Sequence, residues 1–275
     1  MTTAPTAARV PLPSRFFAVV RRHLLSLYTI IALVYLFLPV AIVILFSFND
    51  NQGRFNFVWQ GFTLKSWRHA FDVPGLFDSL VTSLQIAFIS ASVATVLGTF
   101  IALALVRYRY RGRGTTNFLI FLPMATPEVV LGSSVLALFL ALKVQTGFGT
   151  IVIAHIMFNI SFVVVTVKAR LAGFDRHLEE AAMDLYANEW TTFRRVTLPM
   201  ILPGVFAAFM LGFALSFDDF IITNFNSGGT VTFPMFIWGA ARVGVPPQVN
   251  VFGTAVFLVT LGLMLLNVAL QRNRS

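Results

Sequence analysis

Cysteine is absent from this 275-residue sequence, and only 11% of its residues are charged. Without cysteine the chain can form neither a disulfide nor a thiolate metal site. Soluble domains carry about 25% charged residues, so the low charge and the 57% hydrophobic content indicate an integral membrane protein. The sequence also lacks a Gly-x-x-x-x-Gly-Lys-Ser/Thr motif, and indeed any Gly-Lys pair, which excludes a phosphate-binding loop of that kind.

Long uncharged stretches dominate the rest of the chain. A transmembrane helix needs about 20 mainly apolar residues, so we expect an all-α integral membrane protein with six transmembrane helices within residues 24–270. Tails 1–23 and 271–275 flank this region. The expected spans are Leu24–Phe46, Leu80–Val106, Asn117–Leu142, Gly149–Val167, Met200–Thr223 and Val251–Leu270. The first span is too long for a cleaved signal peptide, and no cleavage site follows it.

Basic residues are distributed unevenly between the loops. Fifteen of the 20 Lys and Arg residues lie in the two tails and in the loops after the second and fourth spans. By the positive-inside rule, both termini and the loop 168–199 are expected to be cytoplasmic, and loops 47–79 and 224–250 to face outward. This rule accounts for the formal charge of +9, so no nucleic-acid partner is expected.

Two predicted spans carry a small residue at every fourth position. Small residues allow close approach of helix backbones in lipid, so we interpret both stripes as packing surfaces. The stripe of the fifth span also suits an interface with a partner chain. The stripes are Ser90, Ala94, Gly98 and Ala102, and Gly204, Ala208, Gly212 and Ser216.

The polar segment between the fourth and fifth spans predicts two short helices. Asp175 is a good N-cap, and the acidic Glu179 and Glu180 suit the start of a helix that runs to about Leu185. Asn188 predicts the cap of a second helix, through about residue 196. Pro203 is expected in the first turn of the fifth span.

This segment contains Glu180-Ala181-Ala182, Asp184-Leu185 and Leu198-Pro199. Together these residues resemble the EAA loop of ABC-importer permeases. The resemblance implies a type I ABC importer permease fold and a loop that docks onto a cytoplasmic ATPase. It also implies two ATPase copies that bind ATP and Mg, a second permease subunit, and no cofactor in this chain. The docking residues that it implies are Glu179, Glu180, Ala181, Ala182, Asp184, Leu185 and Tyr186.

Tyr186 departs from the family pattern, which usually has glycine at this position. Glycine suits a left-handed helix end, whereas that conformation costs tyrosine roughly 1–2 kcal/mol. Either the turn is reshaped or the strain is tolerated. We predict that the turn survives, because Asn188 still offers a cap; one unbroken helix over residues 176–196 would contradict this.

Ionisable residues within spans are costly and indicate functional sites. Asp218 and Asp219 lie between Phe217 and Phe220, and carboxylates beside aromatic rings suit a cationic amine. The alternatives are a helix-end cap or an ion pair with Arg242.

Glu128 follows Thr126-Pro127, which predicts a helix restarted by the cap Thr126. The helix dipole alone would explain this acid, but a broken helix beside the substrate pathway would also place it against a passing cation. His155 and Asn159, four residues apart, suit hydrogen bonds between helices.

Four segments resemble the second permease of polyamine (spermidine/putrescine) importers. These are Tyr35–Asn49, Phe62–Trp67, Ser216–Phe225 and Thr232–Asn250. The resemblance implies a bacterial cytoplasmic-membrane permease, surrounded by membrane lipid, that works by alternating access. An extracytoplasmic binding protein would deliver the small-molecule substrate to its outward loops.

Other functions remain open at this point. Importers of aminoethylphosphonate, opines or iron share much of this layout, although paired aspartates disfavour a phosphonate. An ion-coupled secondary transporter usually has inverted repeats, and none is evident here. A membrane enzyme would need a cluster of catalytic groups, and four scattered histidines without cysteine do not suggest one.

Overall fold

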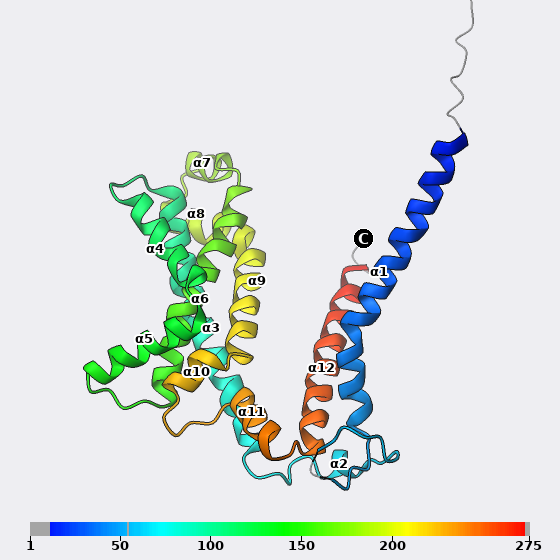
Figure 1. Ribbon diagram of the computed structural model, residues 1–275. Helices are drawn as coiled ribbons and strands as arrows, with labels where there is room; N and C mark the ends of the chain where they lie inside the picture. Colours follow the sequence, from blue (N-terminus) through cyan, green and yellow to red (C-terminus); the bar gives the residue numbers. More distant parts are fainter. Residues whose placement is uncertain (1–11, 54, 273–275) are drawn as a thin grey trace, which may run out of the picture. The chain divides into compact units, whose positions relative to one another are not determined.

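The computed structural model describes residues 12–53 and 55–272, in which helices are the regular secondary structure (Figure 1). The outer parts of both predicted tails, 1–11 and 273–275, lie outside the described residues. The chain divides into two compact units, one of residues 1–73 with 243–275 and one of residues 74–242. Each unit is described by itself.

The first unit pairs the two ends of the chain. Helix α1 (Leu12–Phe46) packs along α12 (Pro247–Arg272), and the short α2 (Lys65–Arg68) also contacts α12 (Figure 1). Asn49 organises the loop after α1, because its buried amide donates to Asn56 Oδ1 at 2.7 Å and accepts from the Gln60 N–H at 2.7 Å. A buried amide with such partners fixes the loop without a sheet.

The second unit is built around three long helices, α3, α6 and α9. They pack mainly through small and β-branched side chains, among them Ala94, Val163 and Ala208. Its helices are α3 (Leu76–Arg107), α4 (Arg113–Ala125), α5 (Glu128–Ala141), α6 (Phe148–Ala172), α7 (His177–Asp184), α8 (Glu189–Thr192), the π-helical turn η1 (Phe193–Thr197), α9 (Leu198–Phe217), α10 (Ile221–Asn226) and α11 (Phe233–Val243).

The small-residue stripes are packing surfaces, as predicted. A Cβ at Gly98 would lie 2.6 Å from Val163 Cγ1 of α6, which shows how closely these helices approach. Ser90 and Ser216 meet across α3 and α9, with their hydroxyl oxygens 2.9 Å apart. The suggestion that the α9 stripe faces a partner chain is wrong, because Ala208 is buried against the chain's own helices.

The described helices confirm most of the predicted apolar spans. Four are long and apolar enough to cross a membrane, at His23–Phe46, Leu76–Arg107, Phe148–Ala172 and Glu189–Phe217. Helices α4 and α5 are long and apolar enough only when taken together, and they are bent by 107° at the predicted break. The described apolar part of α12 is shorter, so the total of six spans stays a prediction.

The fifth span differs from its prediction at both ends. The helix is continuous from Glu189 through the π-helical turn, so Pro203 lies inside it and Pro199 occupies the first turn of α9. At its C-terminal end α9 stops at Phe217 rather than at Thr223. The chain breaks at residues 218–220 because the side chain of Asp219 caps a new helix, α10.

Candidate functional site

A pocket of about 600 Å³ opens in the second unit at the broken ends of its helices. Glu128, the first residue of α5, and Asp218, which ends α9, both line it. Aromatic rings surround these carboxylates, and the rest of the lining is apolar. The rings are Phe217, Phe220, Phe233 and Trp238. Two exposed acids among aromatic faces form a site suited to a cation with an apolar body.

The aromatic rings of the pocket are in contact with one another. Phe220 and Trp238 have centroids 5.1 Å apart, and Phe217 stacks on Phe233 with centroids 6.3 Å apart. Arg242 places its guanidinium carbon 5.5 Å from the centroid of Trp238. The Trp238 ring therefore already interacts with a cation of the chain itself. Among the described residues, Arg242 forms no ion pair with Asp218 or Asp219.

Asp219 lies apart from this pocket lining. Its side chain is 7% exposed, and Oδ2 accepts hydrogen bonds from the Thr223 N–H and hydroxyl, both at 2.7 Å. His155 Nε2 lies 3.3 Å from the same oxygen, and its side chain is 3% exposed. The structure thus separates two adjacent aspartates: Asp218 lines the pocket, and Asp219 caps α10 inside the helix bundle.

Buried polar side chains of α6 hold this region in place. Asn159 donates to the Gly212 carbonyl at 3.2 Å and to Ser216 Oγ at 2.8 Å, both on α9. His155 contacts Thr223 of α10, with 3.0 Å between Nε2 and Oγ1. The predicted hydrogen bonds between helices are confirmed. They fix α6 to both sides of the break at Asp218.

Helix α10 also packs closely on α5, which carries Glu128. Gly132 makes this possible, because a Cβ there would lie 2.9 Å from Cδ2 of Phe225. Asn226 donates to the Gly132 carbonyl at 3.3 Å. The helix restarts at Glu128 as predicted, but Thr126 does not cap it, since the Thr126 hydroxyl donates back to the carbonyl of Leu122 at 2.7 Å.

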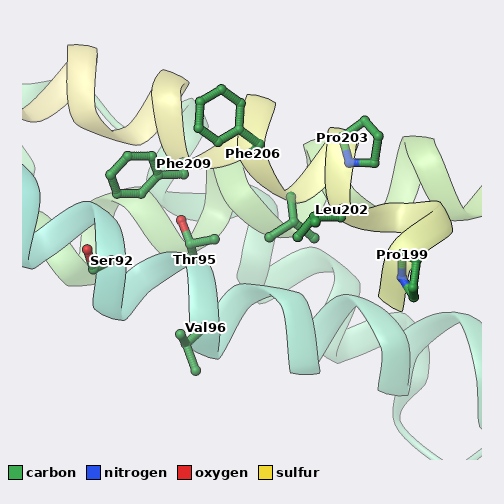
Figure 2. Close-up of a pocket in the computed structure, with 9 residues that line it drawn as sticks. Ser92, Thr95, Val96, Pro199, Leu202, Pro203, Phe206 and Phe209 are labelled. Carbon is green, nitrogen blue, oxygen red and sulfur yellow. The ribbon is translucent and has the colours of Figure 1, made fainter. Parts of the chain in front are cut away.

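A second pocket, of about 620 Å³, lies between α3 and α9. Figure 2 shows Leu202, Phe206 and Phe209 of α9 lying along the same space as Ser92 and Thr95 of α3. Among the described residues that line it, none is charged. This groove therefore offers a cation no ion pair, and it is not the site that the acidic residues of the sequence predict.

The predicted docking loop is a short helix with one exposed side. Helix α7 begins one residue later than predicted, because Arg176 rather than Asp175 is its N-cap, but Asp175 Oδ1 still accepts the N–H of His177, at 3.0 Å. Asn188 caps α8 by accepting the N–H of Thr191 at 2.8 Å. The exposed members of the predicted docking set are Glu180, Ala181, Asp184, Leu185 and Tyr186.

Asp175 and His177 form an exposed pair at the start of α7, with 2.8 Å between Oδ1 and Nδ1. The hydrogen bond to His177 lowers the pKa of the Asp175 carboxyl below its ordinary value. The same bond raises the pKa of the His177 imidazole. The pair therefore favours the charged form of both groups.

Tyr186 adopts the left-handed conformation, with φ of 65°. Its N–H donates to the Met183 carbonyl at 2.9 Å, and the N–H of Ala187 donates to the Ala182 carbonyl at 3.1 Å. These two bonds define a Schellman helix end, a motif that favours glycine at the position of Tyr186. The turn survives as predicted, and the strain is tolerated.

Glu179 points into the chain instead of outward. Its Oε1 accepts hydrogen bonds from Arg107 Nη2, at the end of α3, and from the hydroxyl of Thr197 in η1. The Glu179 side chain is 15% exposed, whereas neighbouring Glu180 lies on the exposed side of α7. The sequence alone did not indicate this difference between two adjacent glutamates.

Long apolar helices, broken beside a pocket that holds two carboxylates, define a membrane transport protein. Residues 94–273 match the model of the family described as "Binding-protein-dependent transport system inner membrane component", and the chain belongs to this family. It is thus an inner-membrane permease component of a bacterial ABC importer.

Curated relatives cover nearly the whole chain. It is 38% identical over 242 residues to the spermidine/putrescine transport system permease protein PotC of Escherichia coli, covering 88% of this chain and 91% of the relative. It is 36% identical over 230 residues to the putrescine transport system permease protein PotI of the same organism, covering 81% of each.

A solved structure supports the fold. The chain resembles a subunit in the crystal structure of a bacterial ABC transporter that imports the acidic polysaccharide alginate. The TM-score is 0.64 at 15% identity, covering 97% of this chain and 99% of that one. The predicted type I ABC importer permease fold is confirmed at this level.

Proposed function

We propose that this permease subunit translocates polyamines, and that the pocket between Glu128 and Asp218 receives them. The observation that carries the proposal is the presence of two carboxylates and four aromatic rings around one space of about 600 Å³. The similarity to a spermidine/putrescine permease and to a putrescine permease supports the same substrate class.

The chemistry of the pocket matches that of a polyamine. A polyamine carries ammonium groups separated by methylene chains, so it needs negative charge at intervals and apolar surface between. Glu128 and Asp218 offer charge-assisted hydrogen bonds to ammonium groups, while Phe220 and Trp238 offer aromatic faces. Apolar side chains such as Ile237 line the remaining wall.

Asp219 has a different role within this proposal. Its carboxylate oxygens already accept hydrogen bonds from Ile222 and Thr223, and His155 lies beside it. We infer that Asp219 positions Asp218 by holding the break between α9 and α10. Loss of Asp219 would then affect transport through the shape of the pocket.

The transport cycle requires partners outside this chain. We infer that two copies of an ABC ATPase bind ATP and Mg, and that one docks on the exposed side of α7 formed by Glu180, Asp184 and Tyr186. A second permease subunit completes the pathway, and an extracytoplasmic binding protein delivers the polyamine. Closure of the ATPase pair then drives alternating access in the membrane helices.

Uptake of labelled spermidine and putrescine, in cells that lack this chain and in cells that regain it, tests the substrate. We expect Asp218→Asn and Glu128→Gln each to raise KM about tenfold or more, because a lost charge-assisted bond costs about 1.5–3 kcal/mol. Asp78→Asn, which removes an exposed carboxylate outside the pocket, is the matched control.

The outcome separates this proposal from its alternatives. Unchanged uptake in cells without the chain, when no other polyamine importer is present, would exclude the polyamine assignment and leave the permease class intact. Uptake that persists in membrane vesicles without any ATPase would instead favour an ion-coupled transporter.

A further inference from the structure

Helix α7 is held to the membrane helices mainly by polar contacts. All eight of its residues lie in the described part of the chain, and none is buried. An apolar face packed on the bundle is therefore not what fixes its position. The covalent chain and the polar side chains that tie α7 to its neighbours are therefore a main route for a force that a partner applies to it.

The main polar tie joins three elements at one point. Arg107 is the last residue of α3, and its Nη2 donates to Glu179 Oε1 of α7 and to Thr197 Oγ1 of η1, the latter at 3.1 Å. The Thr197 hydroxyl donates to the same Glu179 oxygen, and Thr197 is fully buried. One carboxylate thus holds the ends of two long helices together.

A second bond reinforces the tie from the other side. Arg176, just before α7, donates from Nη2 to the carbonyl of Val106 at 2.9 Å. That carbonyl is among the last of α3, where helix carbonyls lack partners within the helix and a cationic side chain is favoured. The start of α7 is therefore bonded twice to the cytoplasmic end of α3.

We propose that Arg107, Glu179 and Thr197 form a latch that makes α3 and α9 follow the movement of α7. Charge-assisted bonds between partly buried groups are stronger and better oriented than neutral ones, so the latch acts as a rigid link. Glu179 is then a positioning residue inside the chain, and the contact with the ATPase falls to the exposed side of α7. This inference rests on the proposed docking of an ATPase, but not on the identity of the substrate.

Swapping the charges of Arg107 and Glu179 tests whether these two residues act as a pair. The variants are Arg107→Glu, Glu179→Arg and the double variant that carries both changes. Arg109→Glu is the matched control, because Arg109 is exposed two residues beyond the latch. Each is prepared as the full complex in lipid nanodiscs, and hydrogen exchange is compared without nucleotide and with ADP trapped by vanadate after ATP hydrolysis.

In the wild type we expect the vanadate-trapped state to change hydrogen exchange both in α7 and at the cytoplasmic end of α3. Each single variant should keep a response in α7 but reduce the response of α3 at least about threefold, and the double variant should restore it, as coupled pairs do in double-mutant cycles. Arg109→Glu should resemble the wild type. Polyamine uptake per ATP hydrolysed should fall and recover in parallel.

Two results would overturn the latch. One is an α3 response in both single variants as large as in the wild type; the other is a double variant no better than either single one. A wild-type complex in which ATP leaves α7 unchanged would instead refute the proposed docking, and the latch with it. Failure to transport spermidine would refute only the substrate assignment, since the exchange measurement does not depend on it.

Discussion

Replacing Tyr186 by glycine is expected to stabilise the end of α7. The left-handed conformation costs a residue with a side chain about 1–2 kcal/mol, and Tyr186 is 99% exposed, so no contact within the chain compensates for it. Glycine loses about 0.5–1 kcal/mol more conformational entropy on folding. With both contributions taken near the middle of their ranges, the net stabilisation of the helix end is about 0.5–1 kcal/mol.

Hydrogen exchange over residues 177–188 measures this effect. Amides at a helix end exchange through local opening, so a stabilisation of about 0.5–1 kcal/mol slows their exchange about two- to fivefold. Tyr186→Phe keeps the left-handed cost and should exchange like the wild type. Exchange that stays unchanged or becomes faster in Tyr186→Gly would refute the reasoning.

The chain offers a matched control at the end of α5. Lys143 is also left-handed, with φ of 57°, and the N–H groups of Lys143 and Val144 make the same two bonds to the carbonyls of Leu140 and Phe139. Lys143→Gly should slow exchange at the end of α5 by a similar factor and leave α7 unaffected. If transport falls in Tyr186→Gly but not in Lys143→Gly, the tyrosine side chain itself contributes to docking.

Three further predictions concern packing, capping and pH. Gly98→Ala should lower the melting temperature of the purified subunit, because the new Cβ would lie 2.6 Å from Val163 Cγ1 of α6, at a cost of about 1–3 kcal/mol. Gly114→Ala should not lower it, because no neighbouring atom lies within 4 Å of a Cβ at that position. Asn188→Ala should weaken the start of α8 by about 1 kcal/mol, seen as faster hydrogen exchange, and Asn188→Asp should not. The pair of Asp175 and His177 should protect the start of α7 most between the ordinary pKa values of the two groups, about 4 and 6.5. The raised pKa of His177 means that its contribution is complete below about 6.5 and is lost as pH rises through the folded value. The lowered pKa of Asp175 means that its contribution is lost as pH falls through the folded value. Exchange that has no pH dependence after correction for the intrinsic rate, or the same dependence in His177→Gln, would contradict this.

The sequence predicted the long helices well because hydropathy alone determines them. The predicted span Leu80–Val106 lies within α3, and Gly149–Val167 lies within α6. The break before Glu128 was also predictable, since proline disfavours a helical residue before it. The early end of α9 was not, because apolar residues resume at Phe220 directly after the two aspartates, so hydropathy does not show that Asp219 caps a new helix there.

The acidic residues of the candidate site could be predicted from the sequence, but their arrangement in space could not. Asp218 and Glu128 were identified as costly charges in apolar surroundings, and the structure places both on one pocket. Nothing local distinguishes Asp218 from Asp219, or Glu179 from Glu180. Glu179 and Glu180 are neighbours in α7 and point about 100° apart, whereas Asp218 and Asp219 lie at the break between α9 and α10, so packing decides which of each pair is buried. Trp238 was not predicted, because the sequence does not show that α11 folds back beside Glu128 and Asp218.

The π-helical turn Phe193–Thr197 joins the loop that carries α7 to α9, the helix that leads to the pocket. Such a turn contains one residue more than the α-helix would need. Deleting a residue there would restore regular winding and rotate everything that precedes it by about 100° around the axis of α9. The loop could then keep its sequence while facing another side of the bundle. A junction for exchanging docking loops between related permeases should therefore lie outside this turn, before Asn188 or after Pro203.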